Sequence, residues 1–297
     1  MKVRIGYGFG TQRGFTAAGF TAMVDALETL RFDSLWLSER ITADAPDPIV
    51  GLAVAAGRTE KLKLGTSVQV LPGRNPALLA KELASLDVLC NGRFLPAFGL
   101  GIAHPAEQQA FGVDRADRAP WFEEALPLLR RFWTEDAVDH AGSRFHYEGL
   151  KVRPHPVQQP PDIWLGGRGP KELRRVGRLA DGWLASFSMP AETATGRATI
   201  ETHAADHGRT IDAEHFGAMI ISSPGPLPEP VKALLATRAG EVDPPDLVPG
   251  SLDALERRIT EYVEVGITKL VLVPLHEPSD WLAELEPIAA RVQPLQT

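Results

Sequence analysis

The sequence predicts an α/β protein built as a single (β/α)8 TIM barrel domain over residues 1–297, with insertion loops at the C-terminal face. Two observations support this fold class. About eight short apolar runs alternate with helical patterns along the chain. The runs are apolar at consecutive positions, as expected of parallel strands that are buried on both faces. At 297 residues, 44% of them hydrophobic, the chain is long enough for a large core.

The first half of the chain supplies four strand–helix pairs. Strands are expected at residues 3–7, 35–37, 61–71 and 94–98, and the helices that follow them at 20–30, 49–56, 76–89 and 121–133. In the third of these helices Pro76 suits the first turn. Pro96 lies inside the fourth strand, where it removes a backbone donor. Pro127 lies inside the fourth helix, so we expect that helix to start late or to kink.

The second half repeats the alternation with two interruptions. Strands are expected at residues 163–165, 183–185, 216–221 and 270–273, and helices at 170–179, within 190–207, at 251–265 and at 281–292. Insertions cover about 134–161 and 186–250, and both are rich in proline and glycine outside the polar helix. We expect their breaker-rich parts to be loops over the scaffold, where a functional loop and a surface excursion fit equally well.

Composition limits the classes of partner. The net charge is -7, from 38 acidic and 31 basic residues, which does not favour nucleic acid as the main partner. No apolar run has the length that a bilayer span requires. The single cysteine, Cys90, allows no intramolecular disulfide, and the first residues lack the apolar stretch of a secretory signal. A cytoplasmic protein that acts on a small-molecule substrate is expected.

Polar residues and glycines gather where the predicted strands end. Active sites of such barrels lie at the C-terminal ends of the strands. The candidates in chain order are Gly6–Gly8, Ser38, Glu39, Arg40, Ser67, Val68, Gln69, Gly99, Gly101, His104, Gly166, Gly167, Arg168, Gly169, Ser186, His276 and Glu277.

The stretch LGGRGPKEL, residues 165–173, is the most informative strand end. Glycines let a backbone approach a ligand closely, and the start of the following helix presents unpaired N–H groups to an anion. Arg168 could add a charge-assisted hydrogen bond. A phosphate site and a glycine-rich turn without a ligand fit this motif equally.

Metal and nucleophile chemistry find little support. His203 and His207 have helical spacing, but they lie in a polar segment without a carboxylate motif, which is typical of a solvated helix face. No G-x-S-x-G motif occurs, and Cys90 is expected to be a packing residue. No metal site is predicted.

Together these segments resemble the luciferase-like monooxygenase superfamily of flavin- and deazaflavin-dependent barrel oxidoreductases. The likeness covers nearly the whole chain and is carried by residues 32–40, 62–94, 98–101, 110–113, 153–184 and 261–274. It implies a TIM barrel that binds FMN or the deazaflavin coenzyme F420 at its C-terminal mouth, with a non-proline cis peptide at Ser67–Val68. It also implies a cofactor phosphate at Gly166–Gly167 and a homodimer, for which the leucine-rich helix 76–89 could supply the contact face or simply pack on its own barrel. Asp181–Trp183 also match the family, but they precede strand six, so we expect a structural role for them.

The sequence departs from this family at two positions expected to transfer protons. Deazaflavin-dependent members commonly carry an acidic residue and then histidine after strand two, where this chain has Glu39 and Arg40. Some also carry a glutamate where this chain has Ile102 and Ala103. Arg40 cannot act as an acid–base group near neutral pH, but it can bind an anion or stabilise an oxyanion. A simple ion pair between Glu39 and Arg40 is the alternative.

The resemblance therefore implies a set of roles. Ser67, Val68, Gly99, Gly166, Gly167 and Arg168 would hold the cofactor, and Glu39, Arg40 and His104 would face it as the catalytic candidates. His104 could be a displaced proton donor or a histidine that caps a helix. Three functions remain open: an F420-dependent oxidoreductase, an FMN monooxygenase that uses oxygen, and a relative without catalysis that binds a cofactor or none.

Overall fold

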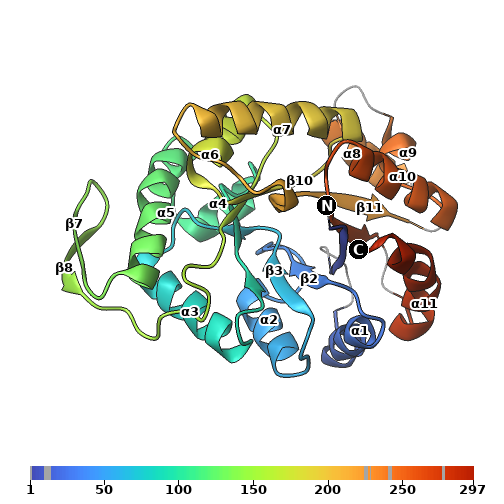
Figure 1. The fold of residues 1–297 in the computed structure, drawn as a ribbon, viewed down its shortest axis with the longest axis horizontal. Coiled ribbons are helices and arrows are strands. Elements are labelled where there is room, and N and C mark those ends of the chain that lie inside the picture. Colours follow the sequence, from blue (N-terminus) through green and yellow to red (C-terminus); the bar gives the residue numbers. More distant parts are fainter. Residues whose placement is uncertain (1, 10–14, 224–226, 228, 240–242, 276–277) are drawn as a thin grey trace.

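A parallel sheet forms the centre of the protein (Figure 1). The computed structural model describes residues 2–9, 15–223, 227, 229–239, 243–275 and 278–297. Within these residues the parallel segments are β1 (Arg4–Gly8), β2 (Ser34–Leu37), β3 (Lys63–Thr66), β4 (Gln69–Val70), β5 (Phe94–Leu95), β6 (Ala97–Gly99), β9 (Trp164–Gly166), β10 (Gly182–Ala185), β11 (Phe216–Ser222) and β12 (Lys269–Pro274).

The pairing of these segments closes a ring. β4 continues β3 after a two-residue break, and β6 continues β5 after Pro96, so each couple is one interrupted strand. β3 pairs with β5 and β4 with β6, while β6 pairs with β9. The order then runs β9-β10-β11-β12-β1-β2-β3. Among the described residues this gives the predicted barrel, and the break at Pro96 confirms the expected loss of a ladder donor.

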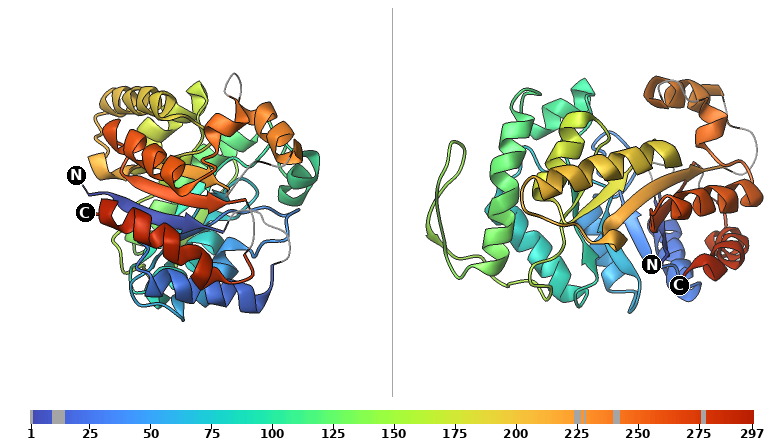
Figure 2. Two further views of the ribbon diagram at one scale, coloured as in Figure 1. Left: turned by 90° about the vertical axis from the view of Figure 1, so that its right-hand side faces the viewer. Right: turned by 45° about the horizontal axis from the view of Figure 1, so that its top comes forward.

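Helices surround the barrel in all three views (Figures 1 and 2). In the described part of the chain they are α1 (Ala17–Thr29), α2 (Pro48–Ala56), α3 (Pro76–Leu89), α4 (Pro105–Phe111), α5 (Arg118–Thr134), α6 (Pro170–Leu179), α7 (Pro190–Ala205), α8 (Glu229–Ala239), α9 (Pro244–Leu247), α10 (Leu252–Glu264) and α11 (Trp281–Val292), with short 3-10 turns at Ala213–His215 and Gln293–Leu295.

The helix predicted at 121–133 does not start late: α5 begins at Arg118 and continues through Pro127. Its buried face, which includes Phe122, Phe132 and Trp133, packs into the core and outweighs the hydrogen bond that proline removes. α4 was not predicted, because seven residues are too few for a recognisable period.

The barrel interior is filled by a cluster separate from the outer core. It consists of Trp36, Ala97, Trp164, Leu184, Val271 and Val273. Glycines make room for its tryptophans: a Cβ on Gly65 would lie 2.4 Å from the Trp36 ring, and one on Gly182 would lie 2.5 Å from the Trp164 ring. The barrel is therefore packed through its middle, and a ligand must bind at its mouth.

The first insertion is a β-hairpin where loops were predicted. β7 (Val138–Ala141) and β8 (His146–Leu150) pair antiparallel and project from the side of the barrel (Figure 1). Glu124 of α5 accepts hydrogen bonds from the backbone N–H groups of Arg144 and Phe145. Prolines and glycines in this region signalled turns, but the strands between them are too short to show alternation.

The second insertion contains helices α7, α8 and α9. α7 confirms the polar helix expected within residues 190–207. α8 and α9 replace the predicted loop, because their prolines stand in the first turn, where a missing N–H costs little. Leu227, Leu235, Leu247 and Val248 form an apolar cluster that attaches this segment to the barrel.

The N-terminal end of the barrel is closed by a buried ion-pair network. The Asp33 carboxylate lies 2.8 Å from Lys269 Nζ and 3.3 Å from Lys63 Nζ, and its side chain is 9% exposed. Thr297 Oγ1 accepts a hydrogen bond from the N–H of Val3, which brings the chain ends together (Figure 1). Among the described residues no helix combines the length and the apolarity needed to cross a bilayer.

Candidate functional site

The interruption of strands three and four creates the centre of the site. The Ser67–Val68 peptide bond is cis, which confirms the expectation. On the neighbouring strand Pro96 breaks the pairing at the same level. The Thr66 hydroxyl bridges the gap, since it donates to the Ala97 carbonyl and accepts from the Ala97 N–H, both at 2.7 Å. The bulge at Ser67–Val68 is thus a defined feature that local hydrogen bonds support.

Gly99 and Gly166 flank the Val68 side chain. A Cβ on Gly99 would lie 2.6 Å from Val68 Cγ2, and a Cβ on Gly166 would lie 3.1 Å from Val68 Cγ1. Val68 itself packs on the interior cluster and remains partly exposed. The structure therefore brings Val68, Gly99 and Gly166 together at the mouth. They form an apolar floor in which the two glycines project no side chain beside Val68.

Polar side chains after β2 hold the other side of the bulge. Ser38 Oγ donates to the Ser67 carbonyl at 2.9 Å and lies 3.2 Å from Ser67 Oγ. Glu39 is 5% exposed, and its carboxylate accepts the N–H of Val70 at 2.6 Å. Arg74 Nε donates to the Val70 carbonyl at 3.0 Å, and its Nη2 bonds Glu39. Both backbone groups of Val70 are thus bound by one ion pair.

Burial raises the pKa of the Glu39 carboxyl, and the positive charge of Arg74 together with the Val70 N–H opposes that rise. The ion-pair partner that the structure gives Glu39 is Arg74, 35 residues away in sequence. The Glu39 side chain is 2% exposed and lies beneath the surface. The Arg74 side chain is 27% exposed and lies at the edge of the surface. The geometry suits a group that positions the bulge.

Arg40 lies half-buried beside a second carboxylate, Glu107 of α4. Glu107 is 3% exposed and accepts hydrogen bonds from Ile41 N, Thr42 N and Thr42 Oγ1. Burial acts to raise its pKa, but these hydrogen bonds and the charge of Arg40 lower it. Glu107 therefore ties α4 to the loop after β2, a contact that sequence patterns do not signal.

His104 precedes α4 at the N-cap position and is exposed. Its side chain makes no capping hydrogen bond, so the alternative of a structural cap is wrong. The histidine stands on the same short helix that Glu107 fastens to the Arg40 loop.

The glycine turn after β9 differs from the expected open anion site. The Glu172 carboxylate accepts the N–H groups of Arg168 at 2.9 Å and Gly169 at 2.8 Å. Gly167 has φ +110°, and a Cβ there would lie 2.7 Å from Glu172 Cβ. Two donors that an anion would use are thus bound to the protein's own carboxylate. The glutamate at the third helical position is a capping-box signal that the sequence does contain.

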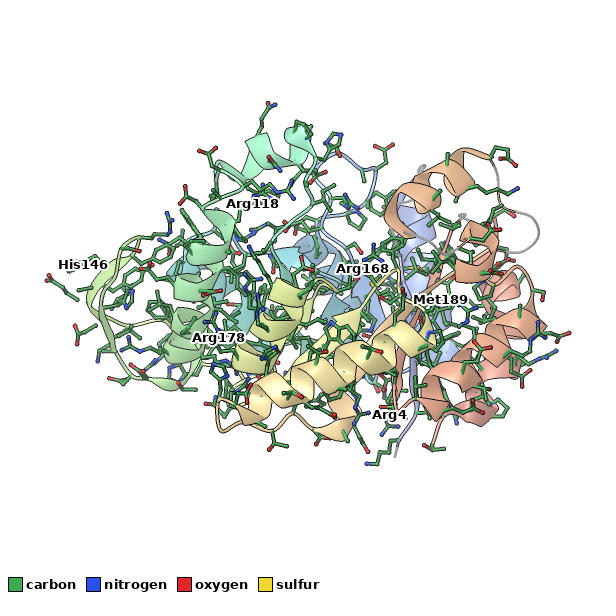
Figure 3. The ribbon with its side chains drawn as sticks, turned by 90° about the horizontal axis from the view of Figure 1, so that it is seen from above. Arg4, Arg118, His146, Arg168, Arg178 and Met189 are labelled. Carbon is green, nitrogen blue, oxygen red and sulfur yellow. The ribbon has the colours of Figure 1, made fainter. Side chains whose placement is uncertain are left out.

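A cavity of about 470 Å³ opens beside this turn. Its walls come from the first turns of α6 and α7 and from the end of β10: Arg168, Gly169, Leu173, Trp183, Ser188, Glu192, Thr195 and Gly196. Arg168 Nη1 donates to the Phe187 carbonyl at 3.0 Å, which places the guanidinium at the cavity (Figure 3). Glu192 caps α7 as Glu172 caps α6, since it accepts the N–H of Met189 at 2.8 Å.

Arg118 is a buried cation that the sequence did not reveal. It is 3% exposed at the start of α5 (Figure 3). Its Nη1 donates to the Leu100 carbonyl at 3.0 Å, and a Cβ on Gly101 would lie 2.9 Å from that nitrogen. Its Nη2 is buried without a hydrogen-bond partner. Arg118 thus holds the loop that follows Gly99 through its hydrogen bond to the Leu100 carbonyl.

Two other strand-end candidates are buried in the protein. Tyr7 is 1% exposed and packs in the outer core against Phe32 and Trp281. Gln69 is fully buried, and neither side-chain polar atom has a partner. His276 and Glu277 fall outside the described residues.

Comparisons with known proteins agree on family and fold. The profile of the luciferase-like monooxygenase family matches residues 3–240. A curated relative, an F420-dependent glucose-6-phosphate dehydrogenase of Beutenbergia cavernae, is 27% identical over 98% of this chain and 97% of its own. The chain spans about half the length of other curated relatives that it matches at 30–31% identity, 43% and 47% in two cases.

Solved structures share the fold at low identity. The coenzyme F420-dependent tetrahydromethanopterin reductase of Methanopyrus kandleri superimposes with a TM-score of 0.79 at 18% identity and covers 100% of both chains. The oxygenating constituent of 3,6-diketocamphane monooxygenase of Pseudomonas putida, in complex with FMN, gives 0.78 at 21% over 100% and 99%. Both cofactor types therefore occur on this barrel.

Proposed function

Because the chain belongs to the luciferase-like monooxygenase family, we propose that it is an F420-dependent oxidoreductase that exchanges a hydride with a small organic substrate. The observation that carries this proposal is the apolar floor at the mouth, where the Val68 side chain lies between the bare glycines Gly99 and Gly166. Full-length similarity to an F420-dependent dehydrogenase favours the deazaflavin.

The residues at the mouth fit a flat aromatic cofactor. Val68 offers an apolar contact to a ring, since a side chain at position 99 would collide with Val68 and one at position 166 would crowd it. The cavity beside Arg168 adjoins this floor through Gly166–Gly169 and suits the anionic tail. We assign Ser67, Val68, Gly99 and Gly166 to the ring and the Arg168 side chain to the tail. Gly167 gives the turn its shape, since Glu172 already binds the N–H groups of Arg168 and Gly169.

The bound deazaflavin would supply the hydride chemistry, namely the exchange of two electrons and one proton with a substrate carbon. A ketone that gains the hydride at carbon gains a proton at oxygen and becomes a secondary alcohol. We assign Arg40 to stabilise the developing oxyanion, because it stays charged near neutral pH. His104 is our candidate to deliver the proton, and Glu39 positions the bulge through Val70.

Anaerobic mixing of the F420-loaded protein with a panel of alcohols and ketones tests this proposal. Deazaflavin absorbance should change with a true substrate, and Arg40→Ala and His104→Ala should slow that change by about 100-fold. His146→Ala, an exposed histidine on the hairpin, is the matched control. Unaltered rates in both site variants would remove the assigned roles.

An FMN monooxygenase that uses reduced flavin and oxygen is the second candidate. It is supported by the fold shared with an FMN-bound monooxygenase. Tight FMN binding without F420 binding would establish it, and failure of both cofactors to bind would favour a relative without cofactor chemistry. These three outcomes are separated by one titration.

We further propose a cytoplasmic homodimer that forms through α2 and α3. α2 has the wholly apolar sequence PIVGLAVAA, yet Val50 is 63% and Val54 43% exposed. On the adjacent α3 Leu78 is 66% and Leu89 74% exposed. A helix that is apolar on all sides is usually buried, so a second copy is expected on this face. Leu78→Asp should convert dimer to monomer in sedimentation, and Leu282→Asp should not.

A further inference from the structure

Two neighbouring helices, α6 and α7, begin in the same way beside the cavity of about 470 Å³. The segment GPKE leads into α6 and the segment MPAE into α7, so each helix has proline at its first position and glutamate at its third. The Glu172 carboxylate accepts the N–H of Gly169, and the Glu192 carboxylate accepts the N–H of Met189, both at 2.8 Å. Figure 3 labels Arg168 beside the first of these helix starts and Met189 at the second. Each helix thus closes its own N-terminus with a negative charge.

The backbone N–H groups of four residues at the start of α6 are bound within the protein. Those of Arg168 and Gly169 donate to the same oxygen of the Glu172 carboxylate. Those of Glu172 and Leu173 donate to the Gly169 carbonyl, each at 2.9 Å, and Pro170 has no N–H. A phosphate at this turn would have to displace the Glu172 carboxylate or lie beside it, where like charges repel.

The charges around the cavity limit which anion can enter it. Among the described residues that line it, the one basic side chain is Arg168 and the one acidic side chain is Glu192. Glu172 adds a second negative charge at the turn, where it binds the lining residue Gly169. A guanidinium pairs well with a single negative charge, whereas further charge on the same ligand group meets two carboxylates. A singly charged group is therefore favoured over a doubly charged one.

We infer that Glu172, together with Glu192, makes this site favour a cofactor chain that carries a singly charged phosphodiester over one that ends in a doubly charged phosphomonoester. This role rests on the proposed function, which places Arg168 at the cofactor's tail, and it names the residues that set the specificity there. F420 carries its phosphate as a diester, whereas FMN ends in a monoester, whose second pKa of about 6 leaves it doubly charged at higher pH. Coulomb repulsion grows with the charge on the ligand, so the two glutamates disfavour FMN more than F420.

Fluorescence titration at a pH well above 7 with three flavins that share one ring tests this role. Riboflavin, the methyl phosphodiester of FMN, and FMN itself carry no charge, one charge and two charges on the chain. Glu172→Gln keeps an oxygen that can accept the two N–H groups and removes the negative charge. It should strengthen the binding of FMN roughly tenfold and that of the methyl diester roughly threefold, and leave riboflavin unchanged, because the repulsion is proportional to ligand charge.

Two further variants sharpen the titration. Glu192→Gln should act in the same direction by a smaller factor, because Glu192 is exposed and solvent screens its charge. Glu148→Gln, the same acid-to-amide change at an exposed position on β8, is the matched control and should change none of the three affinities. No gain for FMN in Glu172→Gln, or an equal gain for riboflavin and FMN, would overturn the role of Glu172.

A second measurement needs no cofactor. In protein labelled with ¹⁵N-glycine, the amide signal of Gly169 is identified by its loss in Gly169→Ala, a change that the ordinary φ of −74° tolerates. Millimolar inorganic phosphate should leave this signal in place in the wild type, where Glu172 holds the N–H. It should shift the signal saturably in Glu172→Ala, which frees two donors at the helix start.

A saturable shift in the wild type, or none in a folded Glu172→Ala protein, would also overturn the role of Glu172. Failure of the proposed function looks different: F420 would not bind, while the phosphate titration would still separate Glu172→Ala from the wild type.

Discussion

The two ends of the barrel differ in how their buried polar groups are paired. At the N-terminal end, Asp33 collects Lys269 and Lys63 around one carboxylate, and its side chain is 9% exposed. At the C-terminal mouth, strands three and four are both interrupted, and Gln69 and Arg118 keep buried atoms without partners. One end pairs its buried charges with one another, and at the other the strand pairing is interrupted where Val68 is presented.

From this difference we expect the N-terminal end to contribute mainly to folding stability and the C-terminal mouth to ligand binding. Charges that are buried and fully paired are costly to disturb but do not contact a ligand. A bulged strand that is held by side chains such as Thr66 and Glu39 can direct a residue toward a cofactor. Substitutions at the two ends should therefore separate unfolding free energy from cofactor affinity.

The largest effect is expected from Gly99→Leu at the mouth. A Cβ at this position would lie 2.6 Å from Val68 Cγ2, so the side chain must displace Val68 and fill the floor. Cofactor affinity should fall by more than about 100-fold, measured by fluorescence titration. Gly57→Ala, where the nearest atom would be 3.7 Å away, is the matched control.

The smaller change Gly99→Ala sharpens this prediction. Its Cβ meets only the Val68 side chain at close range, so the double variant with Val68→Ala should recover part of the lost affinity. Equal loss in single and double variants would show that Val68 is not the contact that matters.

Asp33→Asn, at the N-terminal end, should lower the unfolding free energy and leave the mouth of the barrel unchanged. It leaves Lys269 buried without its countercharge, which costs about 3 kcal/mol of unfolding free energy in urea titration. Cofactor affinity should remain within about twofold. Asp25→Asn, which disrupts an exposed pair with Arg58, should cost far less, because solvent screens exposed ion pairs. A large loss of cofactor affinity in Asp33→Asn would break the division between the two ends.

Lowering the pH should weaken the same ion-pair network around Asp33. Burial acts to raise the pKa of Asp33, but Lys269 and Lys63 lower it to about 2 from 3.8. Since the folded pKa lies below the unfolded one, this stabilisation is present above about pH 4 and is lost as the pH falls toward 2. The unfolding free energy should drop by about 2 kcal/mol more in the wild type than in Asp33→Asn over that window. Parallel curves would contradict the assignment.

The smallest effect is expected from Glu39→Gln. The amide can still accept the Val70 N–H, but it loses the charge pairing with Arg74. Cofactor affinity should fall by about tenfold with little change in the circular dichroism spectrum. An equal loss of affinity in Arg74→Met would support a shared positioning role, whereas an unchanged affinity in both would exclude it.

Sequence patterns were sufficient for the barrel and for the floor of the site. Buried apolar runs place Ser67, Gly99 and Gly166 at strand ends, and barrel geometry then brings strand ends together. Sequence patterns could not show that Glu39 binds Arg74, because contacts between residues 35 apart in the chain depend on the tertiary structure.

Two other features were missed for different reasons. The capping glutamate Glu172 is visible in the order Gly-Pro-Lys-Glu, but the glycines alone suggested an anion site. Helices α8 and α9 were hidden by prolines that stand in their first turns. Tertiary burial of Leu235 and Leu247 then stabilises what local sequence leaves undecided.

Titration of the purified protein with F420 and with FMN tests the central claim most directly. The account predicts saturable binding of F420 that is weakened by Gly99→Leu and unaffected by Asp33→Asn. Absence of binding to either cofactor, in a protein whose circular dichroism shows it to be folded, would contradict it.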